Sequence, residues 1–184
     1  LASNLGAVEL TVALHRVYDS AVDRIVFDVG HQRYTQKIIT GRRDAFPTLR
    51  QLEGLSGFPK PYESEDDAFV TGHASTSVSV ATGMARARAF TGEKYDVAAV
   101  IGDGAMTGGL AYEGLEDAAS CGEPIVIILK DNTMSISKNV GGMSNLLGAM
   151  RYKPAYISFK RWYRAVRKKL PALYSFNHHV KEWL

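Results

Sequence analysis

Two oxygen-bearing side chains stand at a spacing that could hold a metal ion and a phosphate group. Asp103 lies between two glycines in Gly102-Asp103-Gly104, and Asn132 follows 29 residues later. Carboxylate and amide oxygens suit Mg²⁺, whose coordination phosphate and water commonly complete. The glycines let a phosphate approach the backbone, and a following helix would point free N–H groups at it. Gly-Asp-Gly alone is also typical of a plain β-turn, but its pairing with Asn132 favours the site.

Two histidines follow glycines elsewhere in the chain. His31 comes after Gly30, and His73 lies between Gly72 and Ala74. Because imidazole titrates near neutral pH, both side chains suit proton transfer or the stabilisation of an oxyanion. The alternative is a histidine that caps a helix or satisfies a polar group in the core. The residues alone leave both interpretations open.

All these residues follow predicted strands. Apolar runs predict strands over residues 24–29, 68–71, 96–101 and 124–129. Helices are predicted over residues 5–17 with a cap at Ser3 or Asn4, from Ser75 or Thr76 to 90, and over 107–120. This alternation predicts an α/β fold in which helices flank a parallel sheet, with the runs 96–101 and 124–129 buried on both faces. Ligands bind outside the carboxyl ends of such strands, so the four turns are expected to converge.

Composition excludes several classes of protein. The 184 residues are 46% apolar and 22% charged, which is enough apolar material for a core and rules out a disordered chain. No apolar run approaches the roughly 18 residues that span a bilayer. The single cysteine excludes a disulfide framework, and a net charge of +3 is too small to indicate a nucleic-acid binder.

Charge divides the chain into two predicted parts. Residues 1–150 form the predicted α/β domain, and residues 151–184 carry nine Lys or Arg residues and one acidic residue. We interpret the second part as a basic helical extension that packs on further domains, rather than as a nucleic-acid or membrane surface. The chain starts at Leu1 without an initiator Met or a signal peptide, so we expect it to be a piece of a longer protein.

The motifs resemble a known family. Gly102-Asp103-Gly104 with Asn132 resembles the thiamine diphosphate signature of transketolase-like enzymes. The wider sequence resembles 1-deoxy-D-xylulose-5-phosphate synthases over essentially residues 1–170, through five segments: residues 28–32, 37–42, 54–59, 72–77 and 131–137. The resemblance implies the thiamine diphosphate-binding fold, with a diphosphate-binding module in this chain.

The resemblance also implies roles for individual residues. Asp103 and Asn132 would bind Mg²⁺ through their side chains, and Met134 would bind it through its backbone carbonyl. The backbone N–H groups of Gly104 and Ala105 would face the diphosphate of the cofactor. The resemblance further implies that four residues line the cofactor and the substrate entry: His31, Gly72, His73 and Ala74. The two histidines among them are the implied catalytic residues.

By resemblance, the intact enzyme is a cytoplasmic homodimer that condenses pyruvate with glyceraldehyde 3-phosphate and releases carbon dioxide. The reaction feeds isoprenoid and thiamine biosynthesis, and no nucleic-acid or membrane partner is expected. The family's central domain, whose glutamate activates the cofactor, has no counterpart here, so we expect the chain alone to be inactive. Two alternatives are one chain of a split transketolase-like enzyme and a non-catalytic binding module.

Four positions depart from the pattern of the family that the chain resembles. Thr35 and Gln36 stand where the family has proline and histidine. Lys130 stands where it has an asparagine, and Ala74 where it has a serine. A backbone contact at Ala74 would survive the loss of the hydroxyl. The departures leave the substrate contacts around Gln36 open.

Overall fold

The computed structural model describes residues 2–131, together with residues 142, 149 and 158. The chain divides into two compact units, Leu1–Asn139 and Val140–Leu184. Nearly all described residues belong to the first unit, and the account below concerns that unit. The predicted basic extension over residues 151–184 lies outside the described residues, apart from residue 158.

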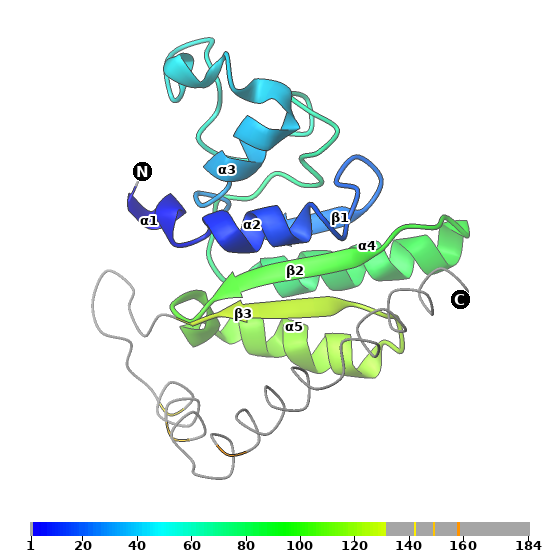
Figure 1. Cartoon of the computed structure of the whole chain (residues 1–184). Helices are drawn as coiled ribbons and strands as arrows, with labels where there is room; N and C mark the ends of the chain where they lie inside the picture. Colours follow the sequence, from blue (N-terminus) through cyan, green and yellow to red (C-terminus); the bar gives the residue numbers. More distant parts are fainter. Residues whose placement is uncertain (1, 132–141, 143–148, 150–157, 159–184) are drawn as a thin grey trace. The chain divides into compact units, whose positions relative to one another are not determined.

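A parallel sheet forms the centre of the described part (Figure 1). Its three strands lie in the order β1 (Arg24–Phe27), β2 (Val97–Gly102) and β3 (Val126–Lys130). The register pairs Phe27 with Val100 and Gly102 with Lys130. Because the strands are parallel, their carboxyl ends lie at one edge of the sheet, which we call the carboxyl edge.

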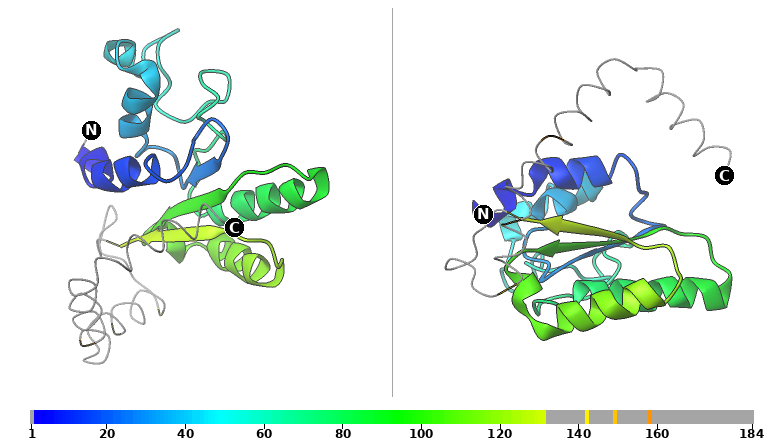
Figure 2. Two further views of the ribbon diagram at one scale, coloured as in Figure 1. Left: turned by 45° about the vertical axis from the view of Figure 1, so that its right-hand side comes forward. Right: turned by 90° about the horizontal axis from the view of Figure 1, so that it is seen from below.

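Helices cover both faces of this sheet. Helices α4 (Ser77–Thr91) and α5 (Gly109–Ser120) lie on one face, and α2 (Val8–Leu14) lies on the other (Figure 2). Ala99 packs toward α4 and α5, whereas its neighbour Val100 packs toward α2. This alternation is the period of two that a strand imposes on its side chains. The predicted fold class, a parallel sheet flanked by helices, is confirmed.

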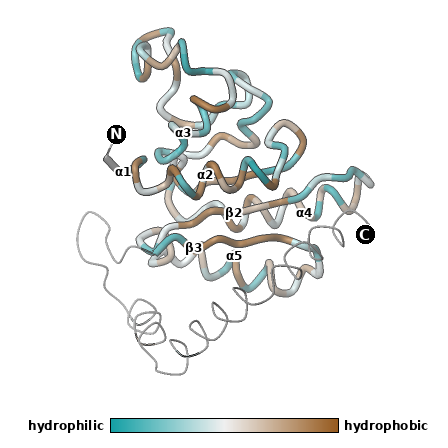
Figure 3. Tube along the Cα trace, viewed as in Figure 1, coloured by the Kyte–Doolittle hydropathy of each residue, from teal (hydrophilic) through white to brown (hydrophobic). Residues whose placement is uncertain are grey.

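Strand β3 is more exposed than its sequence predicts. Figure 3 shows an apolar strand, yet Val126 and Leu129 keep 47% and 38% of their surface exposed. The prediction that the run 124–129 is buried on both faces is therefore wrong in the described structure. The physical reason is position: β3 stands at the edge of the three strands, and α4 packs against β1 and β2.

The chain between β1 and α4 contains short helices instead of a further strand. They are α3 (Tyr34–Lys37), the π-helical turn η1 (Ile38–Arg42) and the 3₁₀ helix η2 (Phe46–Thr48). The predicted strand over residues 68–71 is wrong, because this stretch is irregular and pairs with none of the three strands. Phe69 and Val70 remain 42% and 48% exposed.

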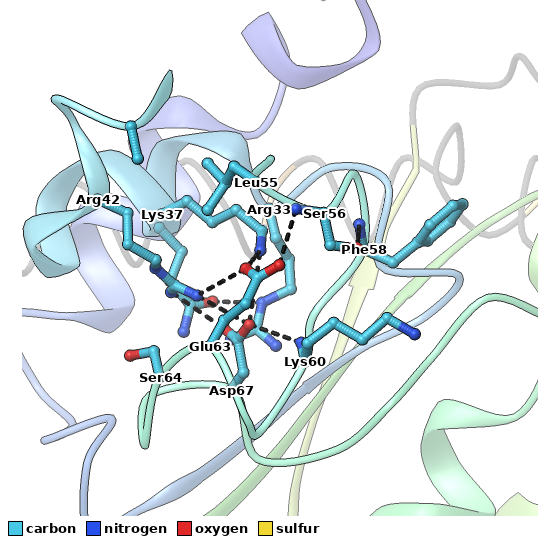
Figure 4. Close-up of polar contacts among 12 residues, drawn as sticks. Arg33, Lys37, Arg42, Leu55, Ser56, Phe58, Lys60, Glu63, Ser64 and Asp67 are labelled. Atoms are coloured by element: carbon cyan, nitrogen blue, oxygen red, sulfur yellow. Dashed lines mark hydrogen bonds and ion pairs between the residues drawn. The ribbon is translucent and has the colours of Figure 1, made fainter. Parts of the chain in front are cut away.

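A buried charge cluster ties this segment together (Figure 4). It contains five side chains that point toward one another: Arg33, Lys37, Arg42, Glu63 and Asp67. The Arg42 guanidinium donates to both Asp67 carboxylate oxygens, at 2.9 and 3.1 Å, and the backbone N–H of Lys60 donates to Asp67 at 2.7 Å. Lys37 Nζ donates to Glu63 at 2.5 Å. The cluster therefore pairs two carboxylates with three cations inside the fold.

The surroundings of this cluster keep Arg33 and Asp67 ionised at neutral pH. Burial lowers the pKa of Arg33 to about 10, so its guanidinium is charged at neutral pH. Burial alone would raise the pKa of Asp67, but the hydrogen bond from Arg42 and the charge of Arg33 outweigh it and hold the pKa below its ordinary value.

The N-terminal helical pattern divides into α1 (Ala2–Leu5) and α2. The predicted cap is wrong, because Asn4 makes longer-range contacts and α2 has no side-chain cap. Asn4 Nδ2 donates to the carbonyl of His31 at 3.0 Å, and Asn4 Oδ1 accepts from the N–H of Tyr34 at 3.1 Å. Asn4 therefore secures the loop after β1. Within residues 2–131, no helix has both the length and the apolar character needed to cross a membrane.

Candidate functional site

The carboxyl edge brings together most of the described residues that the sequence predicts to be functional. The loop after β1 carries His31, the turn after β2 carries Asp103, and Asp131 follows β3. The backbone N–H of Asp103 donates to the carbonyl of Lys130 at 3.0 Å, which joins the ends of β2 and β3. The predicted neighbourhood of these two strand ends is confirmed.

A buried carboxylate at the end of β1 positions the loop that carries His73. Asp28 accepts hydrogen bonds from the backbone N–H groups of Ser75 at 2.8 Å and Ser77 at 3.0 Å. These N–H groups lie at the start of α4, where a negative charge is favourable. Neither Ser75 nor Thr76 caps this helix with its side chain, so that prediction is wrong. Asp28, directly after β1, accepts these hydrogen bonds instead.

Ser75 ties the same loop to the turn after β2. Its Oγ donates to the carbonyl of Ala105 at 2.6 Å. Asp28 and Ser75 are positioning residues that the sequence motifs do not predict. The signal available was an acidic residue directly after an apolar strand, which points to no particular partner before the fold is known.

Two of the four described non-glycine residues with a positive φ lie at this edge, and the other two are Arg50 and Glu53. Val29 and Ser75 adopt positive φ values of 60° and 72°, which are unfavourable for residues with a Cβ. Gly30 has φ 84°, and a Cβ at this position would collide with Thr71 Oγ1 and with the ring of Pro59. Residues held in such conformations often lie at functional sites, where the surrounding contacts hold them in place.

His31 presents an unsatisfied ring nitrogen. Burial and the positive charges of Lys130 and Arg50 lower the pKa of His31, and Asp28 opposes the shift. The imidazole is therefore mainly neutral at pH 7. Its Nδ1 is buried and has no hydrogen-bond partner among the described residues. Since buried polar atoms are nearly always paired, this atom suits a ligand.

His73 is exposed, and its ring is fixed by its neighbour. Nδ1 lies 2.8 Å from the carbonyl of Ala74, and since a carbonyl only accepts, Nδ1 carries the proton in this arrangement. Nε2 is then the nitrogen that can accept a proton. At Gly72, a Cβ would meet no described atom within 4 Å.

Asp103 has a second carboxylate beside it. Burial and the charge of Asp131 raise the pKa of Asp103, and a hydrogen bond from the Gly104 N–H opposes this rise. Two neighbouring carboxylates repel unless a proton or a cation lies between them. Within the described residues, no group of three or more His, Cys, Asp or Glu side chains could hold a metal. The other two predicted ligands, Asn132 and Met134, lie outside the described residues.

Lys130 adds a positive charge to this edge. Its Nζ donates to Gln32 Oε1 in the loop after β1 at 3.0 Å. Burial lowers the pKa of Lys130, and Asp103 opposes the shift. Gln36, which also departs from the family pattern, lies apart from this contact. Its side chain is buried near the charge cluster and forms hydrogen bonds with Arg33 and with the carbonyl of Asp66.

The residues present fit a diphosphate with Mg²⁺. The carboxylate pair suits a hard divalent cation. A Cβ at Gly102 would meet only the carbonyl of Lys130, at 4.0 Å, among the described atoms, so the backbone is open to close approach. His31 Nδ1 has no hydrogen-bond partner in the described part of the chain, and Lys130 carries a positive charge.

Comparison with known proteins identifies the family. The family model of 1-deoxy-D-xylulose-5-phosphate synthase matches residues 1–184. The chain belongs to this synthase family. The 1-deoxy-D-xylulose-5-phosphate synthase of Alkaliphilus oremlandii is 57% identical over 173 residues, which are 94% of this chain and 28% of that protein. Synthase 1 of Geobacter metallireducens is 61% identical over 147 residues, 80% of this chain and 24% of that protein.

The chain thus spans about a quarter of the length of these synthase relatives. Among solved structures, transketolase from Leishmania mexicana matches with a TM-score of 0.57 and 23% identity, over 64% of this chain and 20% of that one. This likeness supports the fold alone. The family predicted from the motifs is confirmed, and the transketolase-like architecture agrees with it.

Proposed function

We propose that this chain is the diphosphate- and Mg²⁺-binding part of a 1-deoxy-D-xylulose-5-phosphate synthase. Such an enzyme depends on thiamine diphosphate and condenses pyruvate with glyceraldehyde 3-phosphate, releasing carbon dioxide. The observation that carries the proposal is the convergence of His31, Asp103 and the Asp28-anchored loop on one sheet edge. Family membership supports the same assignment.

Three groups would hold the metal: the side chains of Asp103 and Asn132 and the backbone carbonyl of Met134. The neighbouring carboxylates at the ends of β2 and β3 support this role, because a divalent cation relieves their repulsion. If the Asp103 carboxylate turns to the metal, it releases the Gly104 N–H, which it engages in this structure. That donor and the N–H of Ala105 would then face a phosphate oxygen.

The other predicted residues would contact the rest of the cofactor and the substrate. Thiamine diphosphate, when bound, serves as the electron sink for decarboxylation. Gly72 and Ala74 offer a backbone that a ligand can approach closely. His31 can exchange a proton through Nδ1, and His73 can accept one at Nε2 while Ala74 holds its other nitrogen.

The relatives are about four times as long as the matched part, and we propose that their remaining length supplies further groups the reaction needs. The 184 residues alone would then bind without turnover. We also propose that residues 1–150 are the binding domain, that residues 151–184 lead toward the remaining part, and that the intact enzyme is a cytoplasmic homodimer.

Calorimetric titration of the chain with thiamine diphosphate, with and without Mg²⁺, tests the proposal. We expect Mg²⁺-dependent binding that Asp103→Ala abolishes. Asp44→Ala removes an exposed carboxylate outside the site and should leave binding unchanged. Circular dichroism verifies that both variants fold. A folded chain that shows no Mg²⁺-dependent binding, or an Asp103→Ala variant that binds like the wild type, would overturn the proposal.

A further inference from the structure

Lys130 reaches across the carboxyl edge. It is the last residue of β3, and its Nζ donates to Gln32 beyond the end of β1 at 3.0 Å. Since β2 lies between β1 and β3, this contact links the ends of the two outer strands. It also runs close to Gly6, where an added Cβ would lie 3.5 Å from Nζ. The ammonium group therefore lies among the loops of the candidate site.

The partner of this ammonium is a neutral amide. The bond to Gln32 Oε1 uses one of the three N–H donors on Nζ and leaves its positive charge uncompensated by that contact. This contrasts with Lys37, whose Nζ pairs with the Glu63 carboxylate in the buried charge cluster. A lysine held by an amide beside a predicted phosphate site is suited to receive an anion.

Charge counting gives the reason a cation is useful here. The carboxylates of Asp103 and Asp131 together carry two negative charges, which a bound Mg²⁺ would cancel. The amide of Asn132 and the carbonyl of Met134 would add no charge. These groups by themselves would offer a diphosphate no net positive charge. Lys130 adds one positive charge to them.

We propose that the Lys130 ammonium binds the diphosphate of the cofactor directly, beside the metal. The inference rests on the proposed function, since it requires a diphosphate at this edge. Lys130 is then a binding residue that the motif of Asp103 and Asn132 does not include. The binding of inorganic pyrophosphate should depend on Lys130 as the binding of thiamine diphosphate does, because both molecules present a diphosphate group.

Calorimetry on the 184-residue chain with Mg²⁺ tests this role. Lys130→Asn removes the charge and should weaken the binding of thiamine diphosphate and of inorganic pyrophosphate about tenfold each, the size of one charge-assisted hydrogen bond. Lys130→Arg keeps the charge and should bind within about threefold of the wild type. Lys94→Asn is the matched control, because Lys94 is exposed before β2, at the opposite end of the strands.

A second variant separates charge from folding. Gln32→Glu keeps Lys130 but gives its ammonium a carboxylate partner, and it should also weaken pyrophosphate binding. The inference is overturned if Lys130→Asn binds both probes like the wild type, if only thiamine diphosphate is affected, or if Lys130→Arg loses as much as Lys130→Asn. If Lys130→Asn does not fold, wild-type affinity in Gln32→Glu overturns it. If the wild type binds neither probe with Mg²⁺, the proposed function itself fails.

Discussion

The buried charge cluster and the carboxyl edge use similar residues in opposite ways. In the cluster, three cations and a backbone donor surround Asp67 and compensate its charge. At the carboxyl edge, Asp103 has another carboxylate as its neighbour, and His31 Nδ1 has no partner among the described residues. Oppositely charged groups in contact stabilise the fold, whereas two neighbouring carboxylates are the arrangement that we propose binds a cation.

The largest expected effect contrasts two aspartates. Asp67→Ala removes the carboxylate that Arg33 and Arg42 surround and leaves buried cations in excess. We expect the free energy of unfolding to fall by about 4 kcal/mol. Asp103→Ala removes one of two repelling carboxylates and should change that free energy by less than about 1 kcal/mol. Urea unfolding measures both, and equal losses in the two variants would contradict the comparison.

A second, smaller effect is the pH dependence of the stability that the buried charge cluster contributes. The pKa of Asp67 in the folded chain lies below its ordinary value of 3.8. Its contribution to stability is therefore complete above that value and is lost as pH falls through the folded-state pKa. Urea unfolding between pH 2.5 and 7 should show this loss, and Asp67→Asn should reduce it. Asp44→Asn serves as the control, and an unchanged acid dependence in Asp67→Asn would exclude Asp67 as the cause.

The smallest expected effect is a change in the pKa of His31 at the carboxyl edge. Burial and the charges of Lys130 and Arg50 lower the pKa of His31, so its imidazole should titrate below 6.5 in NMR spectra of the ring protons. Lys130→Asn removes one of these charges and should raise the pKa of His31, while Lys94→Asn should not. A His31 that titrates identically in all three proteins would show that Lys130 does not act on this ring.

The strongest local patterns predicted the sheet well. The runs that became β1, β2 and β3 are long enough and apolar enough to indicate strands without knowledge of their neighbours. The predicted strand over residues 68–71 failed because a short run forms a strand only where a sheet edge accepts it. Strand β3 was predicted correctly, but its burial was not, since burial depends on which helices reach it.

For the site, the sequence alone determined the residue types at the strand ends and their family motif, because Asp103, His31 and His73 are local features of turns. Only the tertiary structure showed that Asp28 anchors the loop of His73 and that Lys130 reaches Gln32. These contacts join residues 47 and 98 positions apart. Such pairs depend on the order of strands in the sheet and on side-chain reach across it. Neither the strand order nor the reach of a side chain across the sheet can be predicted from the local sequence pattern.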